Sequence, residues 1–326
     1  MFHHEYEQEF LGLITKKLNT TFEVSADHRI LHCSVAGNLK EPKQPKKSNS
    51  QKNDWISSLT VGDEVRVQVI DSQKGVIKEV LPRRSKFGRR SALPMPDKHP
   101  HEQVIAANVD QLIAVFSITN PAPHWNLLDR YLVAAEDSGL AAVICITKMD
   151  LFETLSSDFQ REAVEILKDF QRIGYAVQFT STRTGEGMEE LRCLLSGRIS
   201  LVIGKSGVGK SSLLNQLLPG KELKVNTVNP STGKGRHTTT SPEMFPLDGS
   251  GAVIDTPGMR EFGLWKIPAE ELANDFPEMR PYLGKCRFGV DCAHDEEPGC
   301  AVRKAVMEGH IHPRRYRSYL HLRGEP

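Results

Sequence analysis

The segment GKSGVGKSS, residues 204–212, has the spacing G-x-x-x-x-G-K-[ST] of a loop that wraps the phosphates of a nucleoside triphosphate. Closely spaced glycines let the backbone turn sharply, so that successive N–H groups point at phosphate oxygens. The Lys210 ammonium can reach the β- and γ-phosphates, and the Ser211 hydroxyl can bind Mg²⁺. A strand-like apolar run precedes the segment and a helical pattern follows it, which is the context of a phosphate loop. We predict nucleotide contacts from Gly204, Lys205, Ser206, Gly207, Val208, Gly209, Lys210, Ser211 and Ser212, and a catalytic role for Lys210.

Residues further along the chain have the chemistry to hold the metal and the terminal phosphate. Asp255 lies 45 positions after Lys210, in the run VIDTPG, and suits the acid that binds Mg²⁺ through its water shell. The backbone N–H of Gly258 is suited to meet the γ-phosphate. The polar stretch between the two motifs, NPSTGKGRHTTTSP, is expected to order around phosphate and Mg²⁺. We predict a hydroxyl contact from Thr239, although the sequence does not distinguish it from its two threonine neighbours.

The element that reads the base precedes the phosphate loop. No [NT]-K-x-D segment follows Asp255, and TKMD, which ends in Asp150, lies 54 positions before Gly204. A carboxylate there accepts hydrogen bonds from guanine N1–H and its amino group, a donor pair that adenine lacks. The alternative is an ordinary charged strand end. The predicted base-contacting residues are Thr147, Lys148, Met149 and Asp150, with Ser181 and Thr182 of the later run FTSTRTGEG near the guanine carbonyl.

This order of motifs is rotated, because the base motifs come before the phosphate loop. A sheet whose original termini lie close together tolerates such a permutation, since all core contacts are kept. A second departure is Met259, which stands where many GTPases have the glutamine that orients the attacking water. We predict that His237 takes that role, the alternative being a solvated loop histidine.

Four residues near the C-terminus have the spacing of a metal site, C-x5-C-x-H-x5-C. Three thiolates and one imidazole complete a closed tetrahedral set, which is typical of a structural Zn²⁺ and leaves no open position for catalysis. The alternative is four unrelated side chains. The predicted ligands are Cys286, Cys292, His294 and Cys300. Cys145 and Cys193 lie in apolar runs and are predicted to be core residues.

The elements that must position these residues divide the chain into three predicted domains. Residues 1–98 contain short Val- and Ile-rich segments with turn signals, typical of a five-stranded all-β OB-type barrel. Residues 99–266 alternate apolar strands with amphipathic helices, which predicts an α/β domain with a mostly parallel six-stranded sheet covered on both faces. Residues 267–326 are predicted to form a helical zinc-binding domain. The proline-rich run SALPMPDKHP is the expected linker after the barrel.

Composition limits the class of protein. The 326 residues include six cysteines, and neither an export signal nor a membrane-length apolar run is found, so we expect a cytoplasmic protein without a membrane partner. The net charge is only +1, but three basic runs, around residues 40–53, 81–94 and 312–326, permit an anionic polymer as partner.

These motifs together resemble the RsgA (YjeQ) family of circularly permuted small ribosomal subunit biogenesis GTPases. The resemblance rests on VGDEV, VLPRRS, NVDQLIAV, TKMDL, TGEGMEEL, GKSGVGKSSLLN, TGKGRHTTT, DTPGMREFGL and the cysteine cluster that ends in EPGCAV. It implies GTP and GDP as ligands with Mg²⁺, one structural Zn²⁺, and stimulated hydrolysis on the small ribosomal subunit late in its maturation. It also implies contact with the subunit's rRNA, and we expect a monomer. Thr147 departs from the asparagine common in the family, which implies weaker nucleotide binding.

Two other functions compete with this interpretation. In the first, the chain is a GTPase switch whose barrel and zinc modules bind protein and no RNA. In the second, which is weaker, it is a zinc-dependent nucleic-acid enzyme, but a closed Cys₃His site argues against catalysis at the metal.

Overall fold

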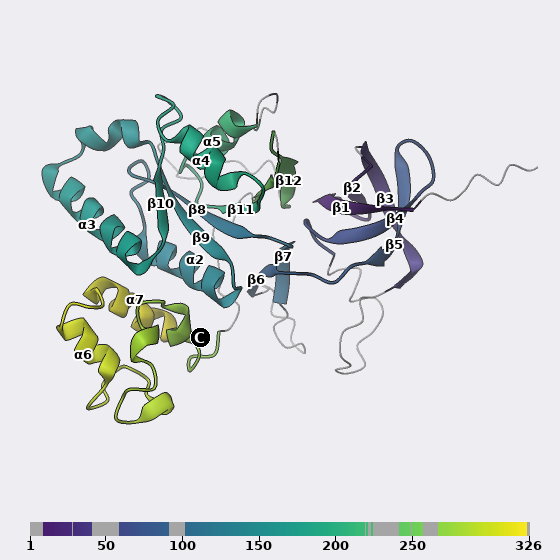
Figure 1. Cartoon of the computed structure of the whole chain (residues 1–326). Coiled ribbons are helices and arrows are strands. Elements are labelled where there is room, and N and C mark those ends of the chain that lie inside the picture. The colour runs from purple at the N-terminus through teal and green to yellow at the C-terminus, as the bar shows by residue number, and fades with distance from the viewer. Residues whose placement is uncertain are drawn as a thin grey trace, which may run out of the picture.

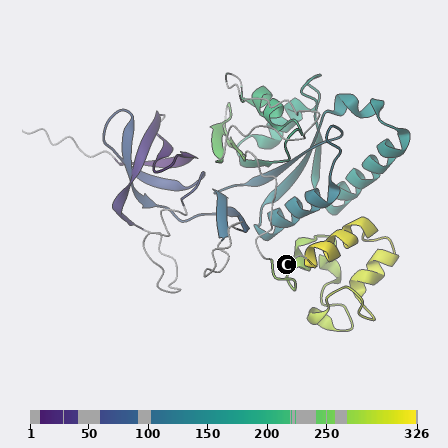
Figure 2. The same cartoon turned by 180° about the vertical axis from the view of Figure 1, so that it is seen from behind.

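The computed structural model describes residues 9–27, 29–40, 59–90, 102–218, 220, 223, 241–248, 250–256 and 267–324. In Figure 1 a β-barrel and a C-terminal helical module lie on different sides of a central sheet that is covered by helices, and Figure 2 shows the same arrangement from behind. No helix among the described residues is long and apolar enough to cross a membrane.

The barrel is formed by the alternating segments near the N-terminus. Strand β2 alternates buried and partly buried residues, as a strand with one face on a core must. The barrel closes because β1 pairs with both β2 and β4, which completes the order β1-β2-β3-β5-β4. Its interior is filled by Ile14, Val24, Leu31, Val65 and Ile77. The strands are β1 (Glu9–Lys17), β2 (Phe22–Ala26), β3 (Arg29–Lys40), β4 (Glu64–Val69) and β5 (Lys74–Val80).

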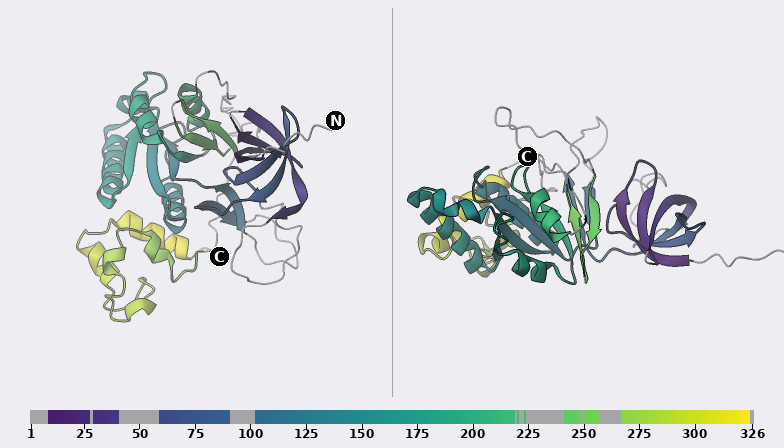
Figure 3. Two further views of the ribbon diagram at one scale, coloured as in Figure 1. Left: turned by 45° about the vertical axis from the view of Figure 1, so that its right-hand side comes forward. Right: turned by 90° about the horizontal axis from the view of Figure 1, so that it is seen from above.

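The central sheet has the neighbour order β10-β9-β8-β11-β13-β12, and only β12 runs antiparallel to its neighbour. Every residue of β8 is buried, because helices cover both faces. Helices α2 and α3 pack on one face and α4 and α5 on the other (Figure 3). The elements are β8 (Gln111–Ser117), α2 (Trp125–Asp137), β9 (Ala141–Thr147), η1 (Met149–Thr154), α3 (Ser157–Ile173), β10 (Ala176–Phe179), α4 (Met188–Leu195), β11 (Ile199–Ile203), α5 (Lys210–Leu217), β12 (Glu243–Pro246) and β13 (Ala252–Asp255).

One expected core residue is in fact at the surface. Cys145 of β9 is fully buried, as predicted, but Cys193 of α4 is exposed. Helix α4 buries Met188, Leu191 and Leu195, which recur at helical spacing and define its inner face. Cys193 falls between them, so the prediction from its apolar neighbours was wrong.

The barrel is joined to the central sheet along two lines. Strand β1 pairs with β12 at Lys16 and Glu243, whose side chains form a 2.9 Å ion pair. The second line is a ribbon of β6 (Lys86–Arg90) and β7 (Glu102–Ala107), and the predicted linker, outside the described residues, connects these two strands. Beside the ribbon, Arg83 donates to the buried Asp63 carboxylate at 2.6 and 2.8 Å.

The C-terminal module packs on α2. Its core includes Val133 of that helix, so its interior is shared with the central unit. Between them lies Arg315, whose side chain has no exposed surface and donates to Asp129 of α2 at 2.7 Å and to Glu278 at 2.6 Å. The elements are η2 (Leu272–Asp275), η3 (Arg280–Tyr282), η4 (Gly289–Asp291), α6 (Ala301–Met307) and α7 (Pro313–Arg323).

The same interface buries a carboxyl group that holds its proton strongly. Burial, and after it the nearby carboxylates with Asp137 foremost, raise the pKa of Asp275 to about 7, while Arg280 acts in the opposite direction. Arg280 itself pairs with Glu136 of α2 at 2.6 Å. A buried acid among other acids favours its neutral form, so this part of the interface is sensitive to pH.

Candidate nucleotide site and metal centre

The predicted phosphate loop connects β11 to α5, which begins at Lys210. Gly207 and Gly209 have φ angles of +85° and +93°, a region that L-residues rarely adopt. Gly204 is needed for a different reason, because a Cβ there would lie 2.5 Å from the Val115 carbonyl oxygen of β8. The motif spacing therefore serves two purposes, to turn the backbone and to bring it close to the neighbouring strand.

At the start of α5, Lys210 meets the predicted metal-binding acid. Its ammonium donates to the Asp255 carboxylate and to the Thr256 carbonyl oxygen, the latter at 2.9 Å. The two residues are close because β11 and β13 are parallel neighbours with Val202 opposite Asp255. The Thr256 hydroxyl ties the end of β13 back to the Val202 carbonyl at 2.9 Å. The lysine and the acid are therefore held at one edge of the sheet.

The predicted base motif touches the phosphate loop directly. The buried Thr147 hydroxyl contacts the Val208 carbonyl oxygen, 61 positions away along the chain. Lys148, at φ +61°, donates from its ammonium to the Gly207 carbonyl at 2.7 Å and to the Asn120 carbonyl. Burial lowers the pKa of Lys148, and the Asp150 carboxylate opposes that change. The two motifs thus form one continuous surface although the chain visits them in rotated order.

Asp150 is held by donors on both carboxylate oxygens. Ser181 donates to Oδ1 and the Arg183 Nε donates to Oδ2, each at 2.6 Å. The Ser181 hydrogen bond is the largest of the causes that lower the pKa of Asp150; burial opposes it, and Arg183 adds to it. The group is therefore a carboxylate at neutral pH, the form that accepts hydrogen bonds from guanine.

The other predicted contacts differ in how they are placed. Met149 is partly buried against the core, and its backbone N–H donates to the Thr180 carbonyl oxygen. Ser181 is buried and Thr182 is exposed. Lys205, Ser206, Ser211 and Ser212 all lie at least partly exposed along the loop and the first turn of α5. His237, Thr239 and Gly258 lie outside the described residues.

Two contacts around the site were missed by the motif search, Arg183 and Asn120. Arg183 lies two residues after Ser181 in STRTGEG, and its positive charge close to a predicted base contact was the available signal. Asn120 contributes a backbone carbonyl from the turn after β8, which a search for side-chain types does not detect.

The four predicted zinc ligands come together in the C-terminal module. Their ligand atoms all lie within 4.8 Å of one another, and all four residues are buried. The Nδ1 atom of His294 lies 3.5 Å from the sulfur atoms of both Cys286 and Cys300. Burial raises the pKa of the Cys292 thiol to about 12, and a divalent cation offsets such a cost because it binds the thiolate form.

The groups around this cluster fit a bound Zn²⁺. Backbone N–H groups at the start of α6 point at two of the sulfurs, Ala301 N–H at Cys286 and Arg303 N–H at Cys300, at 3.3 and 3.5 Å. Glu297 accepts from two backbone N–H groups of the turn that carries the histidine, at 2.7 and 2.9 Å. Such outer contacts orient ligands and are typical of metal centres.

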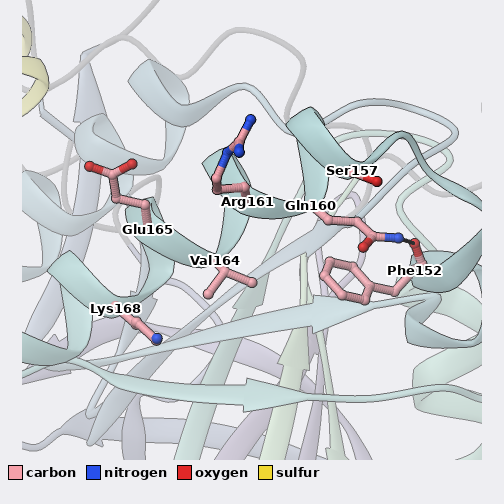
Figure 4. A pocket seen from close by; sticks show the side chains of 7 residues that line it. All are labelled: Phe152, Ser157, Gln160, Arg161, Val164, Glu165 and Lys168. Carbon is pink, nitrogen blue, oxygen red and sulfur yellow. Dashed lines mark hydrogen bonds between the residues drawn. The ribbon is translucent and has the colours of Figure 1, made fainter.

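A separate hollow of about 510 Å³ lies on the outer side of α3 and contains none of the motif residues (Figure 4). Arg161, Val164, Glu165 and Lys168 follow one another along the helix at its edge, and Phe152 lies at one end. Its lining residues are Phe152, Ser157, Gln160, Arg161, Val164, Glu165 and Lys168.

Comparison with known proteins agrees with this geometry. Residues 80–265 match the family model described as RsgA GTPase. A Small ribosomal subunit biogenesis GTPase RsgA from Gemmatimonas aurantiaca is 45% identical over 269 residues, 82% of this chain and 84% of the relative. One of the same name from Chromohalobacter salexigens is 38% identical over 318 residues, 98% of this chain and 86% of the relative.

Two solved structures have the same architecture. YjeQ from Thermotoga maritima matches with a TM-score of 0.74 at 30% identity, covering 98% of this chain and all of that one. YloQ, described as a circularly permuted GTPase, matches with a TM-score of 0.68 at 27% identity, covering 99% of this chain and 96% of that one. The rotated motif order, the closed barrel and the family match lead to one conclusion: this chain belongs to the RsgA GTPase family and has the circularly permuted GTPase fold.

Proposed function

We propose that this protein hydrolyses GTP on the small ribosomal subunit during the late stage of that subunit's maturation. GTP hydrolysis follows from the family, and the ribosomal role follows from the relatives' name, Small ribosomal subunit biogenesis GTPase. The observation that carries the site assignment is the direct contact of Thr147 and Lys148 with the loop at 207–208. This contact supports the binding of one nucleotide across the guanine-reading acid and the phosphate-binding loop.

In this proposal Asp150 accepts the guanine donors and the stem of Lys148 lies along the base. The N–H groups of 204–212 and the Lys210 ammonium hold the phosphates, and Lys210 exchanges Asp255 for the β- and γ-phosphate oxygens. Ser211, Thr239 and, through water, Asp255 would hold Mg²⁺, which would supply charge neutralisation at the phosphates. Gly258 donates its N–H to the γ-phosphate. His237 orients the attacking water, because Met259 has no group that can do so.

The barrel and the C-terminal module would bind the small ribosomal subunit. We assign rRNA phosphates to the OB-type barrel and to α7, and a structural role to the Zn²⁺ that folds residues 267–324. Fewer positive charges are left for RNA than the basic runs imply, because several of their arginines form ion pairs with acids of the same chain. Arg83 pairs with Asp63, Arg84 with Asp110, and Arg314 with Asp129, at 2.6, 3.1 and 2.6 Å. Arg317 of α7 is exposed and is the better candidate for phosphate contact. We place the protein in the cytoplasm, where the subunits mature.

The test is GTP hydrolysis by the full chain with isolated small subunits, with large subunits and with neither. We expect stimulation by small subunits alone, and its loss in Lys210→Ala. Binding to small subunits should weaken steeply between 50 and 200 mM salt if rRNA phosphates carry it. Equal stimulation by both subunits would contradict the proposal. Binding insensitive to salt would favour a protein partner on the particle. If His237→Ala keeps full stimulated turnover, its assigned role is wrong.

A further inference from the structure

The Asp150 carboxylate is covered by a side chain that comes from the loop after β10. Arg183 lies two residues after Ser181 and donates from Nε to Asp150 Oδ2 at 2.6 Å. The Asp150 side chain is 8% exposed, whereas the Arg183 side chain is 71% exposed. Most of the arginine side chain is therefore surrounded by solvent, while its Nε covers the carboxylate from the outside.

The two oxygens of Asp150 are used in different ways. Oδ1 accepts from Ser181, which is buried and tied into its own loop by backbone contacts with Gly185 and Glu186. Oδ2 accepts from Arg183, whose side chain can swing away with little loss of packing because it is largely exposed. The fixed donor therefore orients the carboxylate, and the exposed donor is the one that an incoming ligand can displace.

The donor that must be displaced resembles the ligand chemically. Guanine presents an N1–H and an amino group on one carbon, and this N–C–N arrangement is the same as in the guanidinium of arginine. Both offer in-plane N–H donors to a carboxylate. Adenine presents no such donor pair, so it cannot supply Oδ2 with the donor that it loses when the guanidinium leaves.

We propose that Arg183 acts as an internal substitute for guanine: it occupies Asp150 in the nucleotide-free protein and is displaced only by a base that brings equivalent donors. Arg183 is thus a specificity residue that slows the entry of guanine nucleotides and keeps the acid covered when other bases enter. The inference rests on the proposed role of Asp150 as the guanine-reading acid.

The test measures the association and dissociation rates of fluorescent methylanthraniloyl-GDP with the full chain by stopped flow. Arg183→Gln should raise the association rate constant about 2- to 5-fold, the factor expected when a competing, largely exposed ion pair is removed. This direction is informative, because loss of a positive charge near an anionic ligand otherwise slows association. Added salt should speed association in the wild type, by screening the pair, and should not do so in the variant.

The matched control is Arg161→Gln, which removes the same charge from an exposed pair with Asp158 on α3. It should leave the association rate constant unchanged or slightly lower. The inference is overturned if Arg183→Gln associates no faster than wild type, or if its dissociation rate rises by as much as its association rate. Asp150→Ala separates this failure from failure of the proposed site: if that variant still binds GDP as tightly as wild type, the assignment of Asp150 itself is wrong.

Discussion

Substitution of Arg315 is expected to loosen the C-terminal module from α2. The guanidinium has no exposed surface and lies 4.5 Å from the centre of the Phe276 ring and 5.6 Å from that of Phe170. Burial opposes its charge, but Glu278 and then Asp129 outweigh burial and leave its pKa above the usual value. Arg315→Met keeps much of the volume and leaves two buried carboxylates without this partner.

The size of the effect follows from what remains after the substitution. Removing one partner of a buried pair costs about 3 to 5 kcal/mol. Asp129 keeps Arg314, which donates to it at 2.6 Å, so we expect the lower end, about 3 kcal/mol. For a folding unit of about 150 to 250 residues, a loss of about 3 kcal/mol corresponds to a fall in Tm of roughly 6 to 12 °C.

The assay is differential scanning calorimetry of the zinc-loaded chain, with hydrogen exchange at α2 and α7 to show where protection is lost. Arg161→Met is the control, because its ion pair with Asp158 is largely exposed and should contribute almost nothing. Adding Glu278→Gln to Arg315→Met should restore much of the loss, since Glu278 then carries no unpaired buried charge and Asp129 keeps Arg314. If Arg315→Met behaves like the control, the buried pair is not what holds the module.

Three further outcomes are expected. Thr147→Val leaves the Val208 carbonyl without its hydroxyl contact, at about 1 to 3 kcal/mol, so GDP binding should weaken roughly fivefold or more, while Thr147→Ser should bind as wild type in equilibrium titrations. Cys292→Ser should lower the zinc content and expose residues 267–324 to protease, and Cys193→Ser, outside the cluster, should do neither. Because burial raises the pKa of folded Asp275 to about 7, its stabilising contribution is fully present below about pH 4 and is lost as the pH rises towards 7. Urea unfolding should therefore show Asp275→Asn more stable than wild type above pH 7, by on the order of 2 to 4 kcal/mol, with the difference vanishing near pH 4.

The sequence predicted best what depends on local pattern. The apolar runs that became β8, β9 and β11 are buried strands, and the glycines of 204–209 turn the phosphate loop. The four predicted zinc ligands come together in the structure, and they could be picked out because a metal site requires a short spacing of particular residue types. In each case the signal and the structure lie within a few residues of each other.

Contacts between distant segments could not be predicted in the same way. Asp129 has the spacing of a polar position on α2, and periodicity cannot tell a solvated aspartate from one that is buried against an arginine 186 positions away. From the sequence, Arg83 and Arg84 look like unpaired positive charges, because their acidic partners lie 20 and 26 positions away along the chain. Ion pairing across the fold decides which charges remain for a partner, and one sequence does not contain that information.

The pairing of α2 with α7 also means that two contacting elements are synthesised far apart in time. Asp129 leaves the translating ribosome 186 residues before Arg315, a delay of roughly 10 to 40 s at the usual rates of synthesis. During that interval the Asp129 carboxylate lacks the arginines that pair with it, although β8, β9, β11 and the predicted phosphate loop have all been made before α7. Docking of α7 is therefore a late step in the protein's own biosynthesis, and a nascent chain interrupted before residue 313 would carry the nucleotide motifs while Asp129 lacked both of its arginine partners.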